Sequence, residues 1–156
     1  MSSFSHLDPS GAARMVDVSG KEVSVRQATA SGFVVLSASC VELLRSGSVP
    51  KGDALAVARI AGIQAAKRTP DLVPLCHPIA IHAVSVSLSV ADTGVSISAT
   101  VRTADRTGVE MEALTCVTVA GLALIDMVKA VDPLAEITSV RVEEKLGGKT
   151  GVWRRS

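Results

Sequence analysis

The chain of 156 residues is 47% hydrophobic and only 2% aromatic, and its 16 Lys and Arg against 15 Asp and Glu give a formal net charge of +1. The hydrophobic content excludes intrinsic disorder, and the length predicts a single domain over residues 1–156. Nucleic-acid partners are not expected, because they need a basic surface and aromatic rings on which bases stack. The core must therefore be built from small aliphatic side chains.

The three cysteines, Cys40, Cys76 and Cys116, include no CxxC pair. An odd count without paired spacing fits neither a disulfide framework nor a zinc ribbon, so a reducing, cytoplasmic location is expected. No membrane partner is expected either. The uncharged run 72–91 is interrupted by prolines and histidines, and the run 113–125 is shorter than a bilayer span requires.

The first predicted element is a strand over residues 23–36, where β-branched side chains are frequent. Residues 39–42, Ser-Cys-Val-Glu, have the spacing of a capping box and predict a short helical turn. A longer helix is predicted over residues 54–67, with Asp53 as its N-cap, because this run is rich in good helix formers.

The next two elements form a predicted hairpin. Hydrophobic residues alternate with serine over residues 84–90, and the alternation resumes over residues 95–101 after Asp92-Thr93-Gly94. A period of two predicts antiparallel strands with one face toward water.

A long helix follows the hairpin. Residues 107–110, Thr-Gly-Val-Glu, again have capping-box spacing, and the predicted helix runs to about Lys129. A last strand is predicted over about residues 137–144, and residues 147–156 are expected to form a mobile tail. Leaving the short turn aside, the order βα, ββ, αβ predicts an α+β fold of the ferredoxin-like split βαβ type, with an antiparallel sheet and helices on one face.

The long helix carries charged residues at both ends and an uncharged stretch between them. Glu110, Met111 and Glu112 lie at its start, and Asp126 and Lys129 lie near its end on one face. Charges of these signs also complement the helix dipole, which is a sufficient account of Glu110 or Lys129 taken singly. Because Glu112 and Asp126 are about 21 Å apart along the helix, a catalytic site that uses both ends must be assembled from two subunits.

Cys76 and His77 are adjacent in a loop between Pro74 and Pro78. Neighbouring residues rarely both coordinate one ion, and no second pair of ligands has suitable spacing, so a metal site is not expected. A structural histidine in a rigid loop is favoured over a ligand. The imidazole as a proton shuttle or a hydrogen-bond donor to substrate remains an alternative.

The segment Gly147-Gly148-Lys149 resembles part of a phosphate-binding P-loop. A P-loop is excluded, because its first glycine would fall where Glu143 stands and the sequence leaves no room for the helix that must follow. A lysine flanked by glycines can still close over an anionic ligand.

Several basic residues accompany these motifs. Most such side chains are simply solvated, but if several converge they form an anion pocket that suits a phosphorylated substrate. Mutual repulsion in such a pocket would lower the pKa of a lysine toward the range that is useful in acid–base catalysis. The residues in question are Arg26, Lys51, Lys67, Arg68, Lys129, Lys145 and Lys149.

Seven motifs occur along nearly the whole chain in a characteristic order. They are Met15-Val16-Asp17-Val18-Ser19, Lys51-Gly52-Asp53, residues 58–69 (ARIAGIQAAKRT), Leu75-Cys76-His77-Pro78, residues 107–115 (TGVEMEALT), Asp126-Met127-Val128-Lys129-Ala130-Val131 and Gly147-Gly148-Lys149. Together they closely resemble the cyclic pyranopterin monophosphate synthase family, the C proteins of molybdenum cofactor biosynthesis.

The resemblance implies a ferredoxin-like fold in a homohexamer, a trimer of dimers with active sites between subunits. It also implies a lyase that converts 3',8-cyclo-7,8-dihydroguanosine 5'-triphosphate, a GTP-derived substrate, to the pterin with a cyclic phosphate and releases diphosphate. No metal and no organic cofactor are implied, since molybdenum enters later in the pathway.

The resemblance assigns roles to matching positions of this chain. Asp126 matches the active-site acid, Lys129 its catalytic partner and Lys51 a second essential lysine. The implied substrate-binding residues are Leu75, Cys76, His77, Met111, Glu112, Glu110, Arg26, Lys67, Lys145 and Lys149, with the arginine and the lysines on the triphosphate. Thr150 stands where serine is common, and Trp153 matches nothing that suggests a role.

Two other readings compete with this one. The chain can be a non-catalytic ferredoxin-like module whose lysines bind a nucleotide without turnover. It can also be a zinc-dependent lyase that uses Cys76 and His77. Both readings make predictions that differ from those of a metal-free synthase.

Overall fold

The computed structural model describes residues 4–149 and 151–156. It contains an antiparallel five-stranded sheet in the order β2-β3-β1-β4-β5. The strands are β1 (Ser24–Val35), β2 (Ala83–Ala91), β3 (Gly94–Asp105), β4 (Glu136–Leu146) and β5 (Trp153–Arg154). The helices are α1 (Ala38–Ser46), α2 (Ala54–Lys67), α3 (Thr69–Leu72) and α4 (Glu110–Val128).

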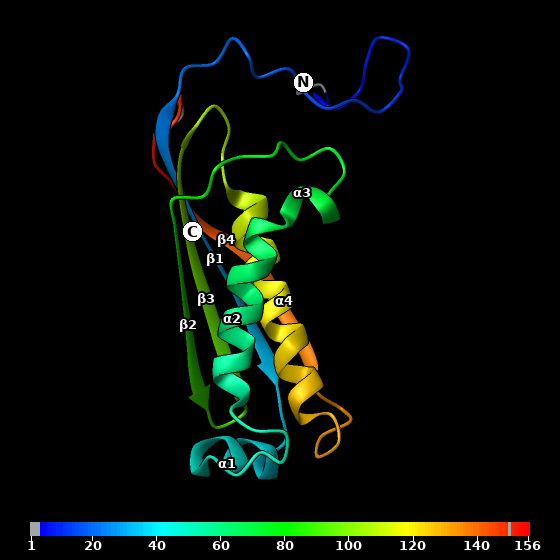
Figure 1. Cartoon of the computed structure of the whole chain (residues 1–156), viewed down its shortest axis with the longest axis vertical. Helices are drawn as coiled ribbons and strands as arrows, with labels where there is room; N and C mark the ends of the chain where they lie inside the picture. The colour runs from blue at the N-terminus through cyan, green and yellow to red at the C-terminus, as the bar shows by residue number, and fades with distance from the viewer. Residues whose placement is uncertain (1–3, 150) are drawn as a thin grey trace.

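The helices α2 and α4 lie side by side over one face of the sheet (Figure 1). Strand β3 separates β1 from β2, and β1 separates β3 from β4, so each strand–helix–strand unit is split by a strand of the other. This arrangement confirms the predicted α+β ferredoxin-like fold. The two long helices run in opposite directions, so the start of α2 and the end of α4 lie at one end of the molecule (Figure 1).

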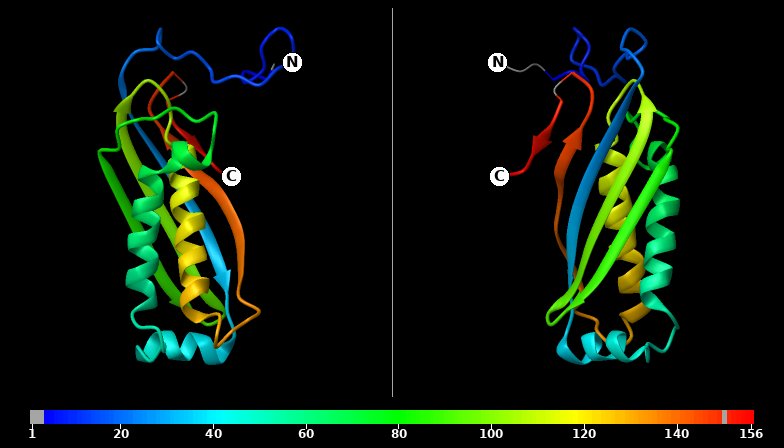
Figure 2. Two further views of the ribbon diagram at one scale, coloured as in Figure 1. Left: turned by 45° about the vertical axis from the view of Figure 1, so that its right-hand side comes forward. Right: turned by 90° about the vertical axis from the view of Figure 1, so that its left-hand side faces the viewer.

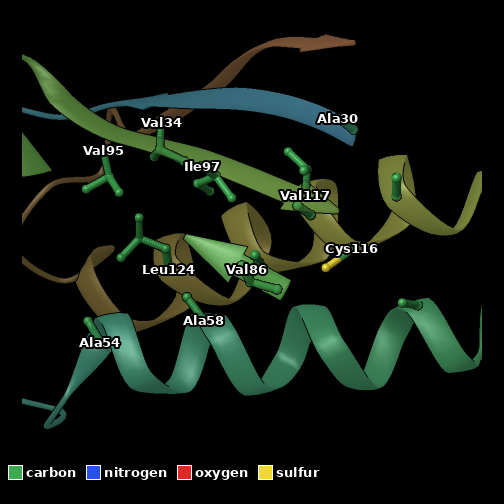
Figure 3. Close-up of a cluster of buried hydrophobic side chains, with 14 of the residues drawn as sticks. Ala30, Val34, Ala54, Ala58, Val86, Val95, Ile97, Cys116, Val117 and Leu124 are labelled. Atoms are coloured by element: carbon green, nitrogen blue, oxygen red, sulfur yellow. The ribbon is translucent and has the colours of Figure 1, made fainter. Parts of the chain in front are cut away.

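The core is built from small side chains, as the composition predicted. Buried alanines of β1 and α2 pack together with the aliphatic residues of β3 and α4 (Figure 3). At the α2–α4 contact, a Cβ atom added to Gly62 would lie 2.9 Å from the carbonyl oxygen of Cys116 and 3.1 Å from the Cβ of Ala120. The close approach of the two helices therefore depends on glycine at this position.

Two of the predicted helix starts are wrong in detail. The N-cap of α1 is Ser37, whose hydroxyl accepts a hydrogen bond from the backbone N–H of Cys40, so the box predicted over residues 39–42 does not form. Helix α4 begins at Glu110 without the capping box predicted over residues 107–110. The carboxylate of Glu110 is instead 2.6 Å from the ammonium of Lys145, so it is engaged with β4 rather than with the helix start.

Two short elements were not predicted. Helix α3 follows α2 directly, and Pro70 fits it because proline is tolerated in a first helical turn. Within the segment expected to be a mobile tail, Trp153–Arg154 form β5 along the edge of β4 (Figure 2). Thr150, where serine is common in the family, lies outside the described residues.

Helix α4 has 19 residues and is, in the described part of the chain, the one helix long and apolar enough to cross a membrane. Half of its most apolar window is buried inside the protein, where it packs against α2 and the sheet. Its hydrophobicity is therefore explained by its position as the core helix of this fold.

Candidate functional site

Three of the predicted catalytic residues meet at the end of the molecule where α2 begins and α4 ends. The ammonium of Lys129 is 2.9 Å from Asp126 Oδ1, one turn away on α4. Lys51, just before α2, donates to the backbone carbonyl of Asp126 at 3.0 Å and lies 3.4 Å from its Oδ2. The antiparallel packing of α2 and α4 thus brings Lys51 to a pair that the helical spacing had already placed on one face.

The electrostatics of this cluster favour a charged carboxylate. A hydrogen bond from Lys129 and the positive charges of Lys129 and Lys51 lower the pKa of Asp126 from its ordinary value. All three side chains remain about half exposed to solvent. The cluster is therefore open to solvent and holds an ionised carboxylate between two ammonium groups.

A cavity of about 810 Å³ lies at the other end of the molecule, near the starts of β1 and α4. Four of the predicted substrate-binding residues line it: Arg26 of β1, Glu110 of α4, Lys145 of β4 and Lys149 of the loop after β4. The Arg26 Nε donates to the carbonyl oxygen of Asp105 at 3.1 Å, and Lys145 pairs with Glu110. With Lys21, the lining carries four cations against two carboxylates, which makes this cavity suitable for a polyanion such as a triphosphate.

The cavity also contains residues that the sequence did not suggest. Lys21 and Glu22 line it from the segment that leads into β1, and Ser24 lines it from the first position of β1. The available signal was the position of Lys21, two residues after the Met15–Ser19 motif, in a turn where its N–H donates to the carbonyl oxygen of Val18. Whether a basic residue before a strand faces a cavity depends on the neighbouring strand β4, which sequence spacing does not reveal.

Glu112 lies in the first turn of α4 and is buried, since only 1% of its surface is exposed. Its Oε2 accepts a hydrogen bond from the Cys76 thiol at 3.5 Å, and its Oε1 has no hydrogen-bond partner among the described residues. Burial raises the pKa of Glu112 above its ordinary value. Burial therefore works against the charged form of this carboxyl group.

The same surroundings keep Cys76 protonated. Burial, followed by the nearby charge of Glu112, raises the pKa of the Cys76 thiol to about 11. A thiol with this pKa is protonated at neutral pH and can donate a hydrogen bond. In residues 4–149 and 151–156, no three His, Cys, Asp or Glu side chains gather closely enough to hold a metal ion.

His77 holds the N-terminal segment. Its Nε2 is hydrogen-bonded to the backbone carbonyl of Val16, and since a carbonyl oxygen only accepts, Nε2 carries the proton. This contact fits the reading of His77 as a structural residue of the loop, and it leaves Nδ1 for another partner.

Three other residues predicted to bind the substrate lie at the same end of the molecule but do not line the cavity. Lys67 is exposed at the end of α2, Leu75 is half-buried in the loop before β2, and Met111 is 40% exposed at the start of α4. In the single chain, the cavity is therefore cationic, and several of the predicted substrate-binding residues lie outside its lining.

The two clusters stand at opposite ends of α4. This helix has 19 residues and is therefore about 28 Å long. One chain does not bring Lys51, Asp126 and Lys129 to the cavity lined by Arg26, Lys145 and Lys149. A small substrate that uses both clusters must bind between two copies of the chain.

Fold and site together define a class: an α+β protein of ferredoxin-like topology with a cationic cavity at one end of its long helix and a lysine–aspartate cluster at the other. Residues 15–148 match the MoaC family. With the relatives described next, this match shows that the chain is an enzyme of the MoaC family.

The relatives resemble the chain over nearly its whole length. A protein of Streptomyces avermitilis named cyclic pyranopterin monophosphate synthase is 68% identical over 98% of this chain and 90% of its own length. A protein of the same name from a Nocardioides species is 64% identical over 97% of this chain and 95% of its own length. Cyclic pyranopterin monophosphate synthase 2 of Mycobacterium tuberculosis is 56% identical over 97% of this chain and 91% of its own length.

Proposed function

We propose that this protein is a cyclic pyranopterin monophosphate synthase that acts in molybdenum cofactor biosynthesis. Its substrate is 3',8-cyclo-7,8-dihydroguanosine 5'-triphosphate, and its products are the cyclic monophosphate and diphosphate. The names of the full-length relatives support the activity. The observation that carries the substrate class is the convergence of Arg26, Lys145 and Lys149 on one cavity of about 810 Å³, which is large enough for a nucleoside triphosphate.

The chemistry divides between the two clusters. The cations of the cavity hold the triphosphate and offset the negative charge that develops as the bond between the α-phosphorus and diphosphate breaks. Asp126 and the lysines Lys129 and Lys51 move protons while the guanine ring opens and recloses. Glu112 supports the substrate-binding segment from inside the protein, where it accepts a hydrogen bond from the Cys76 thiol.

The active unit is a homohexamer, a trimer of dimers in the cytoplasm. Each active site combines the cavity of one subunit with the lysine–aspartate cluster of another. The separation of the two clusters along α4 supports this arrangement, because a single small substrate is much shorter than the helix.

The direct test is to incubate the purified protein with the cyclised dihydro-GTP and to measure diphosphate release. Release with formation of the cyclic phosphate is expected from the wild-type protein. The variant Lys129→Ala should bind the substrate and release little diphosphate. Tight binding by the wild-type protein without any turnover would instead identify a nucleotide-binding module.

A zinc-dependent lyase is the third possibility, and it is tested separately. Protein that has been stripped of metal with a chelator is assayed before and after zinc is returned. The proposed mechanism routes no step through a metal, so full activity is expected in the stripped protein. Activity that disappears on stripping and returns with zinc would contradict it.

A further inference from the structure

The C-terminal segment, for which the sequence suggested no role, is attached to the edge of the sheet. In β5, Arg154 lies opposite Glu144 and Trp153 lies opposite Lys145. The Arg154 Nε is 2.6 Å from the carboxylate of Glu144. One residue further on, the backbone N–H of Arg155 donates to the carbonyl oxygen of Glu143 at 2.8 Å.

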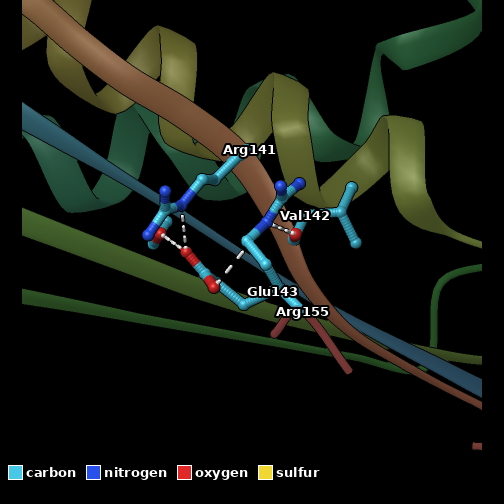
Figure 4. A network of polar contacts seen from close by, with 5 residues as sticks. Arg141, Val142, Glu143 and Arg155 are labelled. Carbon is cyan, nitrogen blue, oxygen red and sulfur yellow. Dashed lines mark hydrogen bonds and ion pairs between the residues drawn. The ribbon is translucent and has the colours of Figure 1, made fainter. Parts of the chain in front are cut away.

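The side chain of Arg155 adds to this attachment. Its Nε donates to the carbonyl oxygen of Val142 at 2.8 Å and lies 4.0 Å from the Glu143 carboxylate (Figure 4). Glu143 is also held by Arg141, at 2.7 Å, and by the hydroxyl of Ser31, at 2.6 Å. The tail is thus connected to two neighbouring strands of the sheet.

The strand β5 closes the loop that carries Lys149. Gly147 and Gly148 lead into this loop with φ angles of +90° and +75°. A Cβ atom on Gly147 would collide with the carbonyl oxygen of Val25, and one on Gly148 would collide with the guanidinium of Arg26. The loop is therefore packed against the β1 wall of the cavity, and Lys149 belongs to the lining.

The attachment is weak enough to be removed without unfolding the protein. A strand of two residues contributes little by itself. The side chains of Arg154 and Glu144 are 70% and 26% exposed, and exposed ion pairs contribute little to global stability. The hydrophobic core contains no residue of β5.

From these contacts we propose that β5 positions Lys149 over the cavity, with Arg154 as the positioning residue through its ion pair with Glu144. The identity of the natural ligand rests on the proposed function, but the positioning itself concerns any polyphosphate that binds in the cavity. When β5 is detached, Lys149 samples many positions and must be ordered at each binding event, so affinity for the polyphosphate falls.

Charge reversal on either side of the Arg154–Glu144 pair tests this proposal and separates it from long-range electrostatics. Arg154→Glu and Glu144→Arg each break the pair, and the double variant restores it with its charges exchanged. Glu144→Arg makes the protein more positive, so a general charge effect predicts tighter binding of an anion. The positioning proposal predicts the opposite, weaker binding by about two- to fivefold, with recovery in the double variant.

Three measurements read out the effect. The first is the dissociation constant for inorganic triphosphate, obtained by calorimetry, which needs no turnover. The second is steady-state kinetics with the cyclised dihydro-GTP, in which KM should rise in each single variant while kcat changes little. The third is fluorescence of Trp153, the only tryptophan in a chain without tyrosine. Its emission should shift to longer wavelength in the single variants and return in the double variant, because detachment exposes the indole.

Arg45→Glu is the matched control. It breaks another exposed ion pair, between Arg45 and Asp92 at 2.9 Å, near the turn between β2 and β3. No change in triphosphate affinity is expected for this variant.

The proposal is overturned if Glu144→Arg binds triphosphate as well as or better than the wild type, or if the wild type does not bind triphosphate. If the wild type binds triphosphate but does not turn over the nucleotide, the proposed function fails and the affinity series still decides the role of β5.

Discussion

Glu112 combines two properties that rarely occur together, a carboxyl group and nearly complete burial. Its only described side-chain partner is the Cys76 thiol, and its other oxygen is unsatisfied. Burial of a charged carboxylate under these conditions is unfavourable, so the protonated form is favoured. The unpartnered oxygen and the raised pKa of Glu112 have one cause, the removal of its carboxyl group from water.

The stability of the protein should therefore depend on the ionisation of Glu112. Burial raises its pKa above the ordinary value of 4.5, so the folded state binds more protons than the unfolded state over the interval that begins near pH 4.5 and ends at the raised pKa. Stability then falls as pH rises through this interval, by about 1.4 kcal/mol for each unit of the shift. Urea unfolding at a series of pH values should show this loss in the wild type and a smaller loss in Glu112→Gln. Parallel pH curves for the two proteins would show that Glu112 is already charged in the folded state.

Asp126 has the opposite environment, exposed and flanked by two cations. We expect Asp126→Asn to lower kcat for diphosphate release by about 100-fold or more, because a positioned acid–base group contributes a factor of this size. The affinity for inorganic triphosphate, measured with a catalytically silent ligand, should change much less. A large loss of triphosphate affinity with kcat intact would assign Asp126 to binding rather than to proton transfer.

The site was predictable where it depends on local geometry. Asp126 and Lys129 are one helical turn apart, and the sequence alone placed them on one face of a helix. Lys51 reaches them only through the packing of α2 on α4, so it was identified by family resemblance and not by spacing. The burial of Glu112 was not predictable in the same way, because a charged residue at a helix start is usually solvated.

At the scale of elements, the pairing of α2 with α4 depends on small residues in the contact. Gly62 faces the backbone of α4, where an added Cβ would lie 2.9 Å from a carbonyl oxygen. Gly121 is also helical, but its added Cβ would meet the side chain of Ile137 at 3.3 Å, which can move. Substitution by alanine raises helix propensity equally at both glycines. The difference in stability between the two variants therefore reports the steric effect of the added Cβ atom.

We expect Gly62→Ala to be less stable than Gly121→Ala by about 1–3 kcal/mol, the usual cost of overpacking. Urea denaturation followed by circular dichroism measures the difference, and equal slopes in denaturant would show that both variants unfold in the same way. Equal stability of the two variants would mean that α2 and α4 separate easily and that their contact does not fix the position of Lys51.

The long elements were predicted because their patterns are repeated many times. The alternation of hydrophobic and polar residues in β2 and β3 identifies a hairpin without any tertiary information. The run of helix-forming residues in α2 identifies a helix in the same way. β5 has two residues and exists through its pairing with β4, so no sequence period could reveal it. The missing cap of α4 has the same origin, since Glu110 pairs with a lysine that is distant in the sequence.

At the scale of the whole molecule, the two charged clusters are separated by the length of α4. A substrate the size of a nucleotide is too short to contact both clusters in one copy. Symmetric association brings the same two surfaces of each copy together repeatedly, so it can form many equivalent shared sites at once. If both clusters act on one substrate, the proposed homohexamer serves catalysis directly, because it brings the two clusters together.

Shared sites make a quantitative prediction for mixed oligomers. Lys51→Ala removes the lysine–aspartate end and Lys145→Ala removes the cavity end, so each variant alone should be inactive. In oligomers assembled from equal amounts of both, about one quarter of the sites would combine an intact cavity with an intact cluster, and about a quarter of wild-type activity should return.

A double variant carrying both changes, assembled with the wild type, provides the control. Shared sites again leave about one quarter of sites intact, whereas sites contained in one subunit would leave about one half. Co-expression with two different affinity tags selects the mixed oligomers before the diphosphate assay. Absence of recovery in the first mixture, together with half activity in the second, would place both clusters in one subunit's site and rule out the intersubunit arrangement.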